Sequence, residues 1–381
     1  MLQTLTRRAF VTTSVLSAAA VRLCTAEERS GTLVYMSSSD AKAGGGIYVG
    51  RWNAHDGTIT GYRRVADIST TFMTVNRRGG ERFLYAGHQT GKNIGGLSGY
   101  RIAPDGDLQP VNTVTAPGAS FSHLACDRTG QCIVAPNYAA GFTLSAKIAG
   151  DGRLSDFISN IPQQGSGPIA NRQAGPHPHG VAIAPNNRFA YINDLGADRI
   201  FIFRLDGAAG TITPADPPAF VMPAGSGPRH LAFHPNGRWA YSINELNSTL
   251  TLFHWSAQTG ALTDIATTPT MSSGGDVAHN RAGEIAFDRE GRFLYCCNRG
   301  AVEELPIFRV GPDGRLTFVA RAPLHGTEAR HSVVSPDDGF LLVANQFSNA
   351  VSIFQRDRGT GLLSLRSQTY PLRGASCIVF V

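Results

Sequence analysis

The sequence predicts an all-β protein, a seven-bladed β-propeller of four-stranded antiparallel blades that is closed by the C-terminal strand. Three observations carry this prediction. A phrase of about 50 residues recurs along the chain. The composition, with 43 Gly, 21 Pro and only 16% charged residues, is typical of many short strands joined by turns. The last residues also complement the first repeat, which lacks its first strand.

The repeated phrase is an apolar strand, a turn with Pro, Asp, Asn or Gly, an aromatic-led strand, a polar gap and a third strand. It reads HGVAIAPNNRFAYINDLGADRIFIFRLD from residue 179 and returns from residues 229, 283 and 329, with weaker copies from 73 and 121. A fourth segment, such as GRLTFVARAPL, completes each copy. The second strands begin at Leu33, Phe83, Cys132, Phe189, Trp239, Phe293 and Phe340. Seven copies of four short strands describe a propeller.

The two ends of the chain fit into one blade. The first copy, TLVYMSS from residue 32, begins with a second strand, and the chain ends in GASCIVFV, which aligns with the first strands ARHSVVSP and FSHLACD. We therefore expect the C-terminal strand to be the innermost strand of the first blade. Closing the ring in this way pairs strand edges that would otherwise be open. The predicted propeller spans residues 30–381.

Residues 1–26 are predicted to be a separate export signal. TRRAFVTTSVLSAAA contains Arg7 and Arg8, then Phe10 and a short apolar run, which resembles a twin-arginine signal. The run is too short to span a bilayer stably. CTA offers a cleavage site before Glu27, although Arg22 is unusual in the late apolar run. We expect a cleaved signal, no membrane span in the mature chain, and a periplasmic or secreted protein.

Charge and cysteine content exclude several classes of protein. The net charge is +6, but three of these charges lie in residues 1–26, so the rest carries only +3, too little to predict nucleic-acid binding. No C-x-x-C pair occurs, so no structural zinc site is predicted. The sequence leaves open whether Cys126 and Cys132, at the ends of CDRTGQC, form a disulfide. We expect no cofactor, no metal and a monomer.

Charged and imidazole side chains recur at the ends of the inner strands. In a propeller the first strand of each blade lines the central channel, and its start opens on the same face as the loop after the second strand. The starts of the first strands carry His179, Arg229, His230, Glu284, Arg330 and His331. The loops after the second strands carry Asp194, Glu245, Arg299 and Gln346. Burying such groups unpaired costs several kcal/mol, so their convergence predicts a paired network or a ligand site.

The stretch GPHPHG, residues 175–180, places two histidines two residues apart where a strand begins. Side chains at i and i+2 of an extended chain point to the same side, so both rings would face the same space. We expect His179 to lie at the channel mouth, within about 8 Å of a point that it shares with Arg229 and Glu245. The prolines around His177 instead favour a ring that is turned out and caps the loop. Such pairs also bind metals, but no third ligand is evident.

Several of these phrases resemble the seven-bladed propeller lactonases, a family that includes propeller-type 6-phosphogluconolactonase and the carboxymuconate lactonising enzyme. The resemblance covers residues 30–381 and rests on GPHPHG, GPRHLAFHPNGRWAYSINELNST, GEIAFDREGRFLYCCNRG and ARHSVVSPD. It implies an active site formed by His177 or His179, Arg229, Glu245 and Arg299. The sequence departs from the family in PDDGF and in AVEEL, which brings Glu303 and Glu304 to the channel rim.

Hydrolysis of a lactone requires a base to activate water and a cation to stabilise the developing oxyanion. Glu245 or His179 could be the base and Arg229 the oxyanion donor, while Arg299 or Arg330 could bind an anionic substituent. We assign substrate contacts to His177, His230, Glu284, Arg330 and His331. The prediction is thus a lactonase that hydrolyses a small sugar-acid lactone at the channel mouth, and no Gly-x-Ser-x-Gly motif suggests a serine hydrolase. The alternatives are a muconate-type lactonising cycloisomerase and a non-catalytic binding propeller of the cell envelope.

Overall fold

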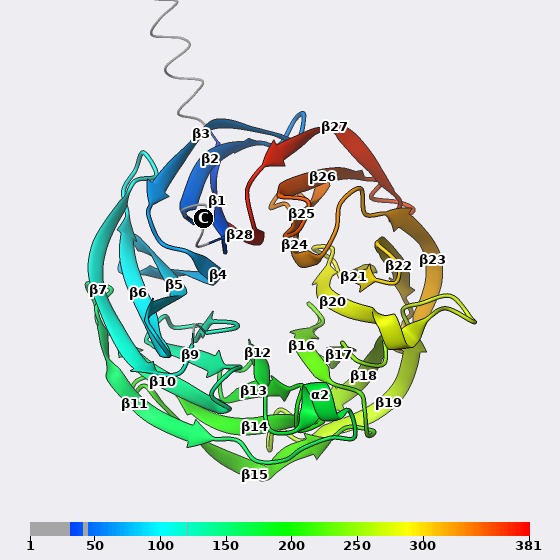
Figure 1. The fold of residues 1–381 in the computed structure, drawn as a ribbon, viewed down its shortest axis with the longest axis horizontal. Coiled ribbons are helices and arrows are strands. Elements are labelled where there is room, and N and C mark those ends of the chain that lie inside the picture. The colour runs from blue at the N-terminus through cyan, green and yellow to red at the C-terminus, as the bar shows by residue number, and fades with distance from the viewer. Residues whose placement is uncertain (1–30, 41–44, 120) are drawn as a thin grey trace, which may run out of the picture.

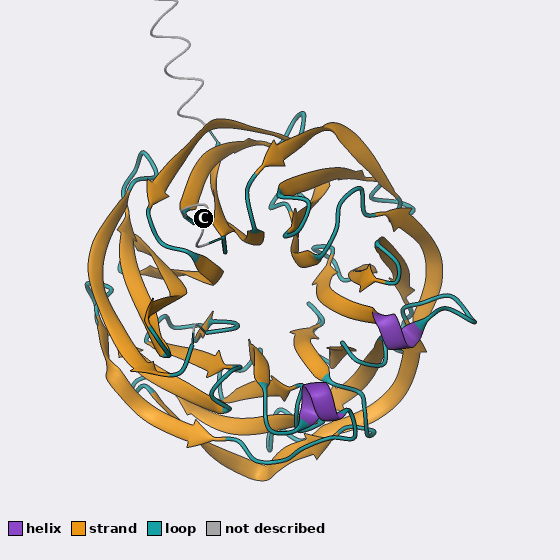
Figure 2. Ribbon diagram, in the orientation of Figure 1, coloured by secondary structure: helices purple, strands orange, loops and turns teal. Residues whose placement is uncertain are grey.

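The computed structural model describes residues 31–40, 45–119 and 121–381, so the predicted export signal lies outside the described residues. Seven four-stranded antiparallel sheets form blades around a central axis (Figure 1). Helical structure in the described chain is limited to α2 (Ala170–Gln173) and the 3-10 turn η1 (Val277–His279), as Figure 2 shows. The predicted fold class is confirmed.

Each blade runs from an inner strand at the axis to an outer strand at the rim. Blade 1 contains β28 (Ala375–Phe380), β1 (Thr32–Ser38), β2 (Ile47–Asn53) and β3 (Thr58–Ala66). Blade 2 contains β4 (Thr70–Arg78), β5 (Glu81–Gly91), β6 (Ile94–Ile102) and β7 (Leu108–Pro117). Blade 3 contains β8 (Ala125–Cys126), β9 (Cys132–Asn137), β10 (Phe142–Ile148) and β11 (Leu154–Pro162). Blade 4 contains β12 (Pro178–Ile183), β13 (Phe189–Asp194), β14 (Arg199–Asp206) and β15 (Thr211–Val221).

The remaining three blades repeat this order. Blade 5 contains β16 (Pro228–Phe233), β17 (Trp239–Asn244), β18 (Thr249–Trp255) and β19 (Leu262–Pro269). Blade 6 contains β20 (Asn280–Phe287), β21 (Phe293–Gly300), β22 (Glu304–Val310) and β23 (Leu316–Pro323). Blade 7 contains β24 (Ala329–Val334), β25 (Phe340–Asn345), β26 (Ala350–Arg356) and β27 (Leu363–Pro371).

Blade 1 joins the two ends of the chain. The inner strand β28 pairs antiparallel with β1, and the hydroxyls of Ser37 and Ser376 are 2.9 Å apart across this pair. Ser376 also donates to the carbonyl of Thr70 in blade 2 at 2.9 Å. The predicted closure by the C-terminal strand is therefore confirmed, and it gives β1 a partner on its inner edge.

A recurring tyrosine fixes each of five blades to the next one. The five side chains lie in second strands and are completely buried: Tyr35, Tyr85, Tyr191, Tyr241 and Tyr295. Their hydroxyls donate to glycine carbonyls in the outer hairpin of the following blade: Gly106, Gly152, Gly260, Gly314 and Gly361. Gly152 has φ +84°, and a Cβ there would lie 2.2 Å from the Phe83 ring, so this turn requires glycine. Each of these tyrosine hydroxyls is thus buried between two blades with its hydrogen bond satisfied.

A one-residue bulge recurs near the start of the inner strands. The register shifts in β4, β12, β16, β24 and β28 leave one residue of each strand without a partner: Thr71, His179, Arg229, Arg330 and Ser376. A further shift in β20 falls between Ala282 and Ile285. A bulge adds one residue to one strand of a pair and re-aims its side chain. The same irregularity in successive blades therefore places polar residues at one end of the propeller.

Cys126 and Cys132 are both free thiols in the structure. Cys126 pairs with Ile133 across the short β8–β9 ladder, so the two cysteines do not stand opposite each other. The disulfide that the sequence left open is therefore absent. Among the described residues no helix is long and apolar enough to cross a membrane.

Candidate active site

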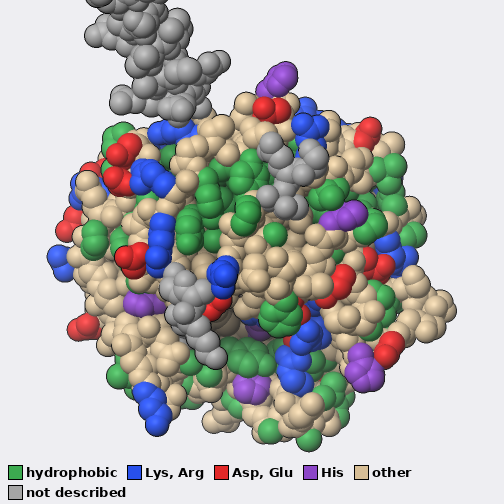
Figure 3. Space-filling model, turned by 45° about the horizontal axis from the view of Figure 1, so that its top comes forward, with side chains coloured by type: hydrophobic (Ala, Val, Ile, Leu, Met, Phe, Trp, Pro, Cys, Tyr) green, Lys and Arg blue, Asp and Glu red, His purple; other side chains and the backbone are tan. Residues whose placement is uncertain are grey.

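A cavity of about 380 Å³ opens at the end of the propeller where the bulges lie. Figure 3 shows this face hollowed near its centre, with basic side chains at the edge of the opening. The cavity is lined by residues of several blades: Thr71, Gln89, Ala119, Phe121, Ser122, Tyr138, Ala139, Arg172, His179, Glu245 and Arg330. The lining thus combines apolar, aromatic and uncharged polar side chains with a charged wall that carries an imidazole, a carboxylate and two guanidinium groups.

Glu245, which directly follows β17, is the centre of the charged wall. Its Oε2 lies 2.8 Å from Arg299 Nη2 and 3.2 Å from Arg229 Nε, and its Oε1 lies 2.6 Å from Arg172 Nη2. Burial opposes ionisation of this carboxyl, but the charges of Arg299, Arg229 and Arg172 outweigh it and lower the pKa of Glu245 to about 2. The carboxylate is therefore permanently ionised at neutral pH.

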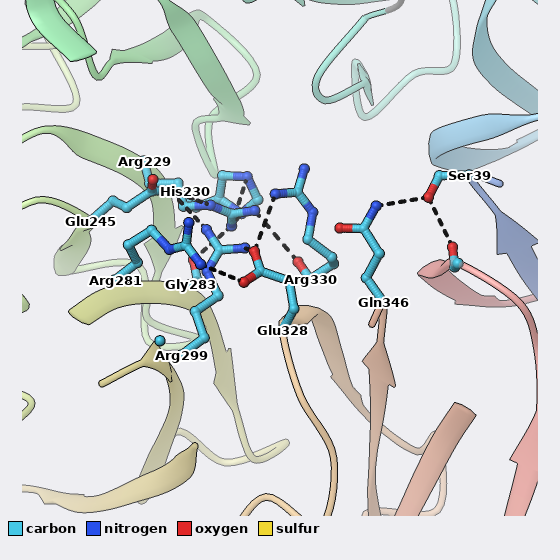
Figure 4. A network of polar contacts seen from close by, with 12 residues as sticks. Ser39, Arg229, His230, Glu245, Arg281, Gly283, Arg299, Glu328, Arg330 and Gln346 are labelled. Atoms are coloured by element: carbon cyan, nitrogen blue, oxygen red, sulfur yellow. Dashed lines mark hydrogen bonds and ion pairs between the residues drawn. The ribbon is translucent and has the colours of Figure 1, made fainter. Parts of the chain in front are cut away.

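Glu328 extends the same group of charges, as Figure 4 shows. Its Oε1 accepts a hydrogen bond from Arg299 Nη1 and its Oε2 accepts one from Arg281 Nη2, each at 2.7 Å. Arg330 Nη1 lies 3.9 Å from Oε1. The backbone amide of Glu328 is held in turn by Glu303, one of the two acids in which the sequence departs from the family. We call the connected set the arginine–glutamate network: Arg172, Arg229, Glu245, Arg281, Arg299, Glu328 and Arg330.

The arginine–glutamate network contains five guanidinium groups and two carboxylates, so it carries excess positive charge. Arg229 and Arg299 are completely covered, whereas the side chain of Arg330 is 30% exposed and lies in the cavity wall. Burial and the charges of Arg299 and Arg229 lower the pKa of Arg330 to about 9. Arg330 thus remains protonated at neutral pH, and its charge is the least compensated one in contact with the cavity.

His179 is the imidazole of the cavity wall. It is the bulged residue of β12, its ring lies 5.7 Å from the Tyr138 ring and 5.0 Å from the His230 ring, and its buried Nδ1 has no hydrogen-bond partner. Burial, followed by the charge of Arg229, holds the pKa of His179 well below its ordinary value of 6.5. The ring is therefore neutral at pH 7, and it is a base beside a cation-rich wall.

His177 does not share this space. Its ring stacks on Tyr138 at 4.5 Å with an interplanar angle of 13°, and its Nδ1 lies 2.9 Å from the Tyr138 carbonyl oxygen. Its backbone amide donates to Asp194. The expectation that both rings face one space is wrong because the bulge at His179 interrupts the alternation of side chains. His177 instead caps the loop, as the flanking prolines suggested, and it is not among the lining residues.

A second layer of histidines lies beneath the cavity. His230 Nδ1 lies 2.9 Å from Glu284 Oε1, and the rings of His230 and His123 are 4.6 Å apart. Phe72 packs against His123 and His331, with ring centroids at 3.9 and 5.4 Å. Of the residues for which we predicted substrate contacts, Arg330 lines the cavity, whereas His230, Glu284 and His331, like His177, do not. His230 and Glu284 are buried, whereas His331 is partly exposed.

Gln346, at the position that corresponds to Glu245 in another blade, lies apart from the network. Its Nε2 donates to Ser39 Oγ at 2.9 Å, and Figure 4 shows the two side chains separated from the arginines. The described residues contain no group of three histidine, cysteine or carboxylate side chains placed to bind a metal ion.

Comparison with known proteins identifies the family. The family model described as "Lactonase, 7-bladed beta-propeller" matches residues 33–380. The chain belongs to this lactonase family. A 6-phosphogluconolactonase of Formosa agariphila is 29% identical over 350 residues, which are 90% of this chain and 97% of that protein. The 6-phosphogluconolactonase of Bacillus subtilis is 30% identical over 75% of this chain and 81% of its own length.

A solved structure gives the same result for the fold. The periplasmic gluconolactonase of Pseudomonas aeruginosa superposes with a TM-score of 0.85 at 29% identity, covering 92% of this chain and 99% of its own. The family that the sequence motifs resemble and the predicted enzyme class, a lactone-hydrolysing enzyme, are confirmed by these relatives.

Four residues of this candidate site were not predicted from the sequence: Arg172, Arg281 and Glu328 of the network, and Tyr138 of the cavity lining. Arg172 lies in α2, within the segment that connects β11 and β12 and is not part of the repeat. The only signal for it is length, because the interval from Cys132 to Phe189 is the longest between successive second strands, and long loops often carry function. Tyr138 lies in the turn after β9, and Glu328, which directly precedes β24, has a φ of 59°.

Proposed function

We propose that this lactonase hydrolyses a small, single-ring sugar-acid lactone in the cavity at the channel mouth. The cavity volume of about 380 Å³ lies at the low end of ligand pockets, which suits a single ring. The observation that carries the proposal is the pairing of one neutral imidazole, His179, with one undercompensated cation, Arg330, in the same wall.

His179 is assigned as the base that activates water. The ring is neutral because burial and neighbouring arginines disfavour its protonated form. Glu245 is the poorer candidate of the two that the sequence left open, because three arginines already bind its carboxylate and hold its pKa at about 2. A general base must take a proton from the attacking water, which a carboxylate with a pKa of about 2 does poorly.

Arg330 is assigned as the group that stabilises the oxyanion. When water adds to the lactone carbonyl, negative charge develops on the carbonyl oxygen, and a fixed cation in a dry site stabilises that charge. Arg229, which we had expected in this role, is covered and donates to the Gly283 carbonyl at 2.6 Å. Arg229 and Arg299 instead bind Oε2 of Glu245 on the side of the carboxylate that is covered by protein. Ring opening leaves a carboxylate product, which the excess positive charge also favours.

The test is a panel of lactones followed by pH-stat, with His179→Ala and Arg330→Gln as variants and the exposed His254→Gln as the matched control. We expect hydrolysis of a sugar lactone by the wild type and a loss of at least about 10² in kcat for each site variant, the scale of a lost oxyanion donor. Closure of a muconate instead of lactone hydrolysis would favour the cycloisomerase. Unchanged turnover in both variants would remove the assignment of these residues.

Export is part of the same proposal, and the periplasmic gluconolactonase of Pseudomonas aeruginosa supports it by analogy. A periplasmic enzyme would be separated from cytosolic sugar phosphates, so we propose an unphosphorylated lactone. Replacing Arg7 and Arg8 together by Lys should retain the precursor inside the cell. A mature protein whose N-terminal sequence still begins at Met1 would contradict export.

A further inference from the structure

We propose that Arg172 is a specificity-determining residue that, together with Glu245, binds neighbouring hydroxyl groups of the lactone ring. This inference rests on the proposed function, because it names which feature of the substrate the cavity selects. It would make the segment between β11 and β12 the part of the chain that distinguishes a polyhydroxylated lactone from a bare one.

The carboxylate of Glu245 has a covered side and an open side. Its Oε2 faces Arg229 and Arg299, whose side chains are 2% and 1% exposed, so no ligand reaches this oxygen. Its Oε1 faces Arg172, whose side chain is 30% exposed. Both Arg172 and Glu245 line the cavity. The Arg172–Glu245 pair is therefore the part of the arginine–glutamate network where a ligand meets a cation and an anion side by side.

The hydrogen-bonding capacity of this pair is not exhausted. A carboxylate offers about four acceptor positions. Hydrogen bonds from Arg172 and Arg299 occupy two of those on Glu245, and Arg229 Nε lies 3.2 Å from Oε2 as an ion pair. A guanidinium has five donor hydrogens, of which one on Nη2 is directed at Glu245 Oε1, and a further contact joins the side chain to Tyr138. One acceptor and several donors therefore remain toward the cavity. A hydroxyl group, which both donates and accepts, matches this combination better than an ester or a methylene does.

Arg172 is held in place by its neighbour in the chain. Gln173 is completely buried, donates from Nε2 to the Leu195 carbonyl at 2.9 Å, and accepts the Ile169 amide at 3.2 Å. A Cβ on Gly167 would lie 2.4 Å from Gln173 Oε1, so the segment approaches this side chain closely. Such anchoring fixes the position of Arg172 before a ligand arrives, which reduces the entropy lost on binding.

The aromatic and apolar part of the lining fits the same ligand. Tyr138, stacked on His177 and edge-on to His179, presents an aromatic side chain to the cavity, and Phe121 and Ala139 continue the apolar surface. A sugar lactone has hydroxyls at its edge and C–H groups on its faces, so one ring suits both the charged and the apolar parts of the lining. A lactone without hydroxyls would leave the open side of Glu245 without a partner once water is displaced, which costs binding energy.

The experiment compares glucono-δ-lactone with δ-valerolactone, which has the same ring and no hydroxyls, for the wild type, Arg172→Gln and Arg172→Lys. The control is Arg199→Gln, because Arg199 Nη1 donates to the Gln164 carbonyl and so fixes the start of the same segment without reaching Glu245. We expect Arg172→Gln to lower the ratio of kcat/KM for glucono-δ-lactone to kcat/KM for δ-valerolactone at least about tenfold, because only the hydroxylated ring loses a hydrogen-bond partner. Arg172→Lys should recover part of the preference, and Arg199→Gln should keep all of it.

If Arg172→Gln lowered kcat/KM equally for both lactones, Arg172 would only position Glu245. If Arg199→Gln lost the preference for glucono-δ-lactone as strongly as Arg172→Gln, the effect would belong to the whole segment between β11 and β12. Either result overturns the inference. Calorimetric binding of the ring-opened acids, gluconate and 5-hydroxypentanoate, tests the subsite without turnover. A wild type that binds gluconate through Arg172 but hydrolyses no lactone would contradict the proposed function and keep the subsite. A wild type that binds neither acid would contradict the subsite.

Discussion

At the scale of single residues, the site is a buried group of charges that compensate one another incompletely. Glu245 holds three arginines, and removing it would leave Arg229 and Arg299 buried without a common partner. Breaking a buried ion pair typically destabilises a protein by about 3–5 kcal/mol. A variant at Glu245 therefore alters the fold as well as the chemistry, and for this reason the more exposed Arg172 and Arg330 give cleaner tests.

The pH dependence of activity should report the neutral state of His179. Because the pKa of His179 lies well below 6.5, the ring remains an active base as the pH falls through 6.5. We expect kcat/KM to stay constant from pH 7.5 down to below pH 6 and to fall only at lower pH. An acid limb centred near pH 6.5, the ordinary value for histidine, would contradict this environment for His179.

The sequence predicted the residues that stand at repeated positions. His179, Arg229, Glu245 and Arg299 occur where other blades also carry polar groups, and the structure brings all four together. The side-chain directions were not predictable, because a bulge changes them without changing the apolar pattern. His177 was misplaced for this reason, and Arg229 proved to be covered because Glu245 and the Gly283 carbonyl bind it.

At the scale of elements, the bulges of the inner strands direct polar side chains into the cavity wall. The bulge in β12 needs Gly180, because a Cβ there would lie 2.4 Å from the Arg229 carbonyl oxygen and 2.7 Å from the His230 ring. Blades 4 and 5 therefore approach each other at a position where only glycine fits.

We expect Gly180→Ala to push β12 away from β16 and to disturb His179 and Arg229 together. Overpacking of this kind costs about 1–3 kcal/mol, and turnover should fall as well. Urea denaturation and lactone hydrolysis measure the two effects. Gly150→Ala is the control, because a Cβ at Gly150 has no neighbour within 4 Å. Equal stability of the two variants would show that the blades can separate without cost.

The elements themselves were largely predictable, since each strand follows the repeated phrase. The connection from β11 to β12 was not, because α2 obeys no repeat and is only four residues long. A single helical turn has no amphipathic period that a sequence could reveal. The exception to the repeat is thus the element that brings Arg172 into the site.

At the scale of the whole molecule, closure by β28 determines whether the ring is complete. Deleting residues 376–381 removes the inner strand of blade 1 and exposes the edge of β1. We expect this truncated protein to aggregate in size-exclusion chromatography. A chain that begins at residue 27 keeps the β1–β28 pair and should remain folded. A truncated protein that melts like the full chain would show that β28 is dispensable.

Acid should destabilise the whole propeller through four histidines at the channel, of which His179 and His230 are buried and His123 and His331 are partly exposed. Burial lowers the pKa of His123, His179, His230 and His331 below 6.5, so below this pH the unfolded chain binds protons that the native chain does not. Asp194, whose pKa burial raises to about 6, opposes the effect by one proton. The free energy of unfolding should thus fall by up to about 4 kcal/mol per pH unit below pH 6.

Urea unfolding between pH 7.5 and 5 measures this slope. His331→Gln removes one of the four imidazoles, so its free energy of unfolding should fall less steeply with decreasing pH than that of the wild type. A free energy of unfolding that is the same at pH 7.5 and at pH 5 would show that these rings are not buried as neutral groups.

The joining of the two chain ends in one blade sets a delay during synthesis. Ser37 and Ser376, which contact each other across the closing pair, are 339 positions apart. At a synthesis rate of about 5–20 residues per second, β1 would wait roughly 17 to 70 s for its inner partner. Six blades are complete by then, while the open edge of β1 stays available to other nascent chains. Ribosome spacing and chaperone supply should therefore govern the yield of this protein more than the stability of its finished ring does.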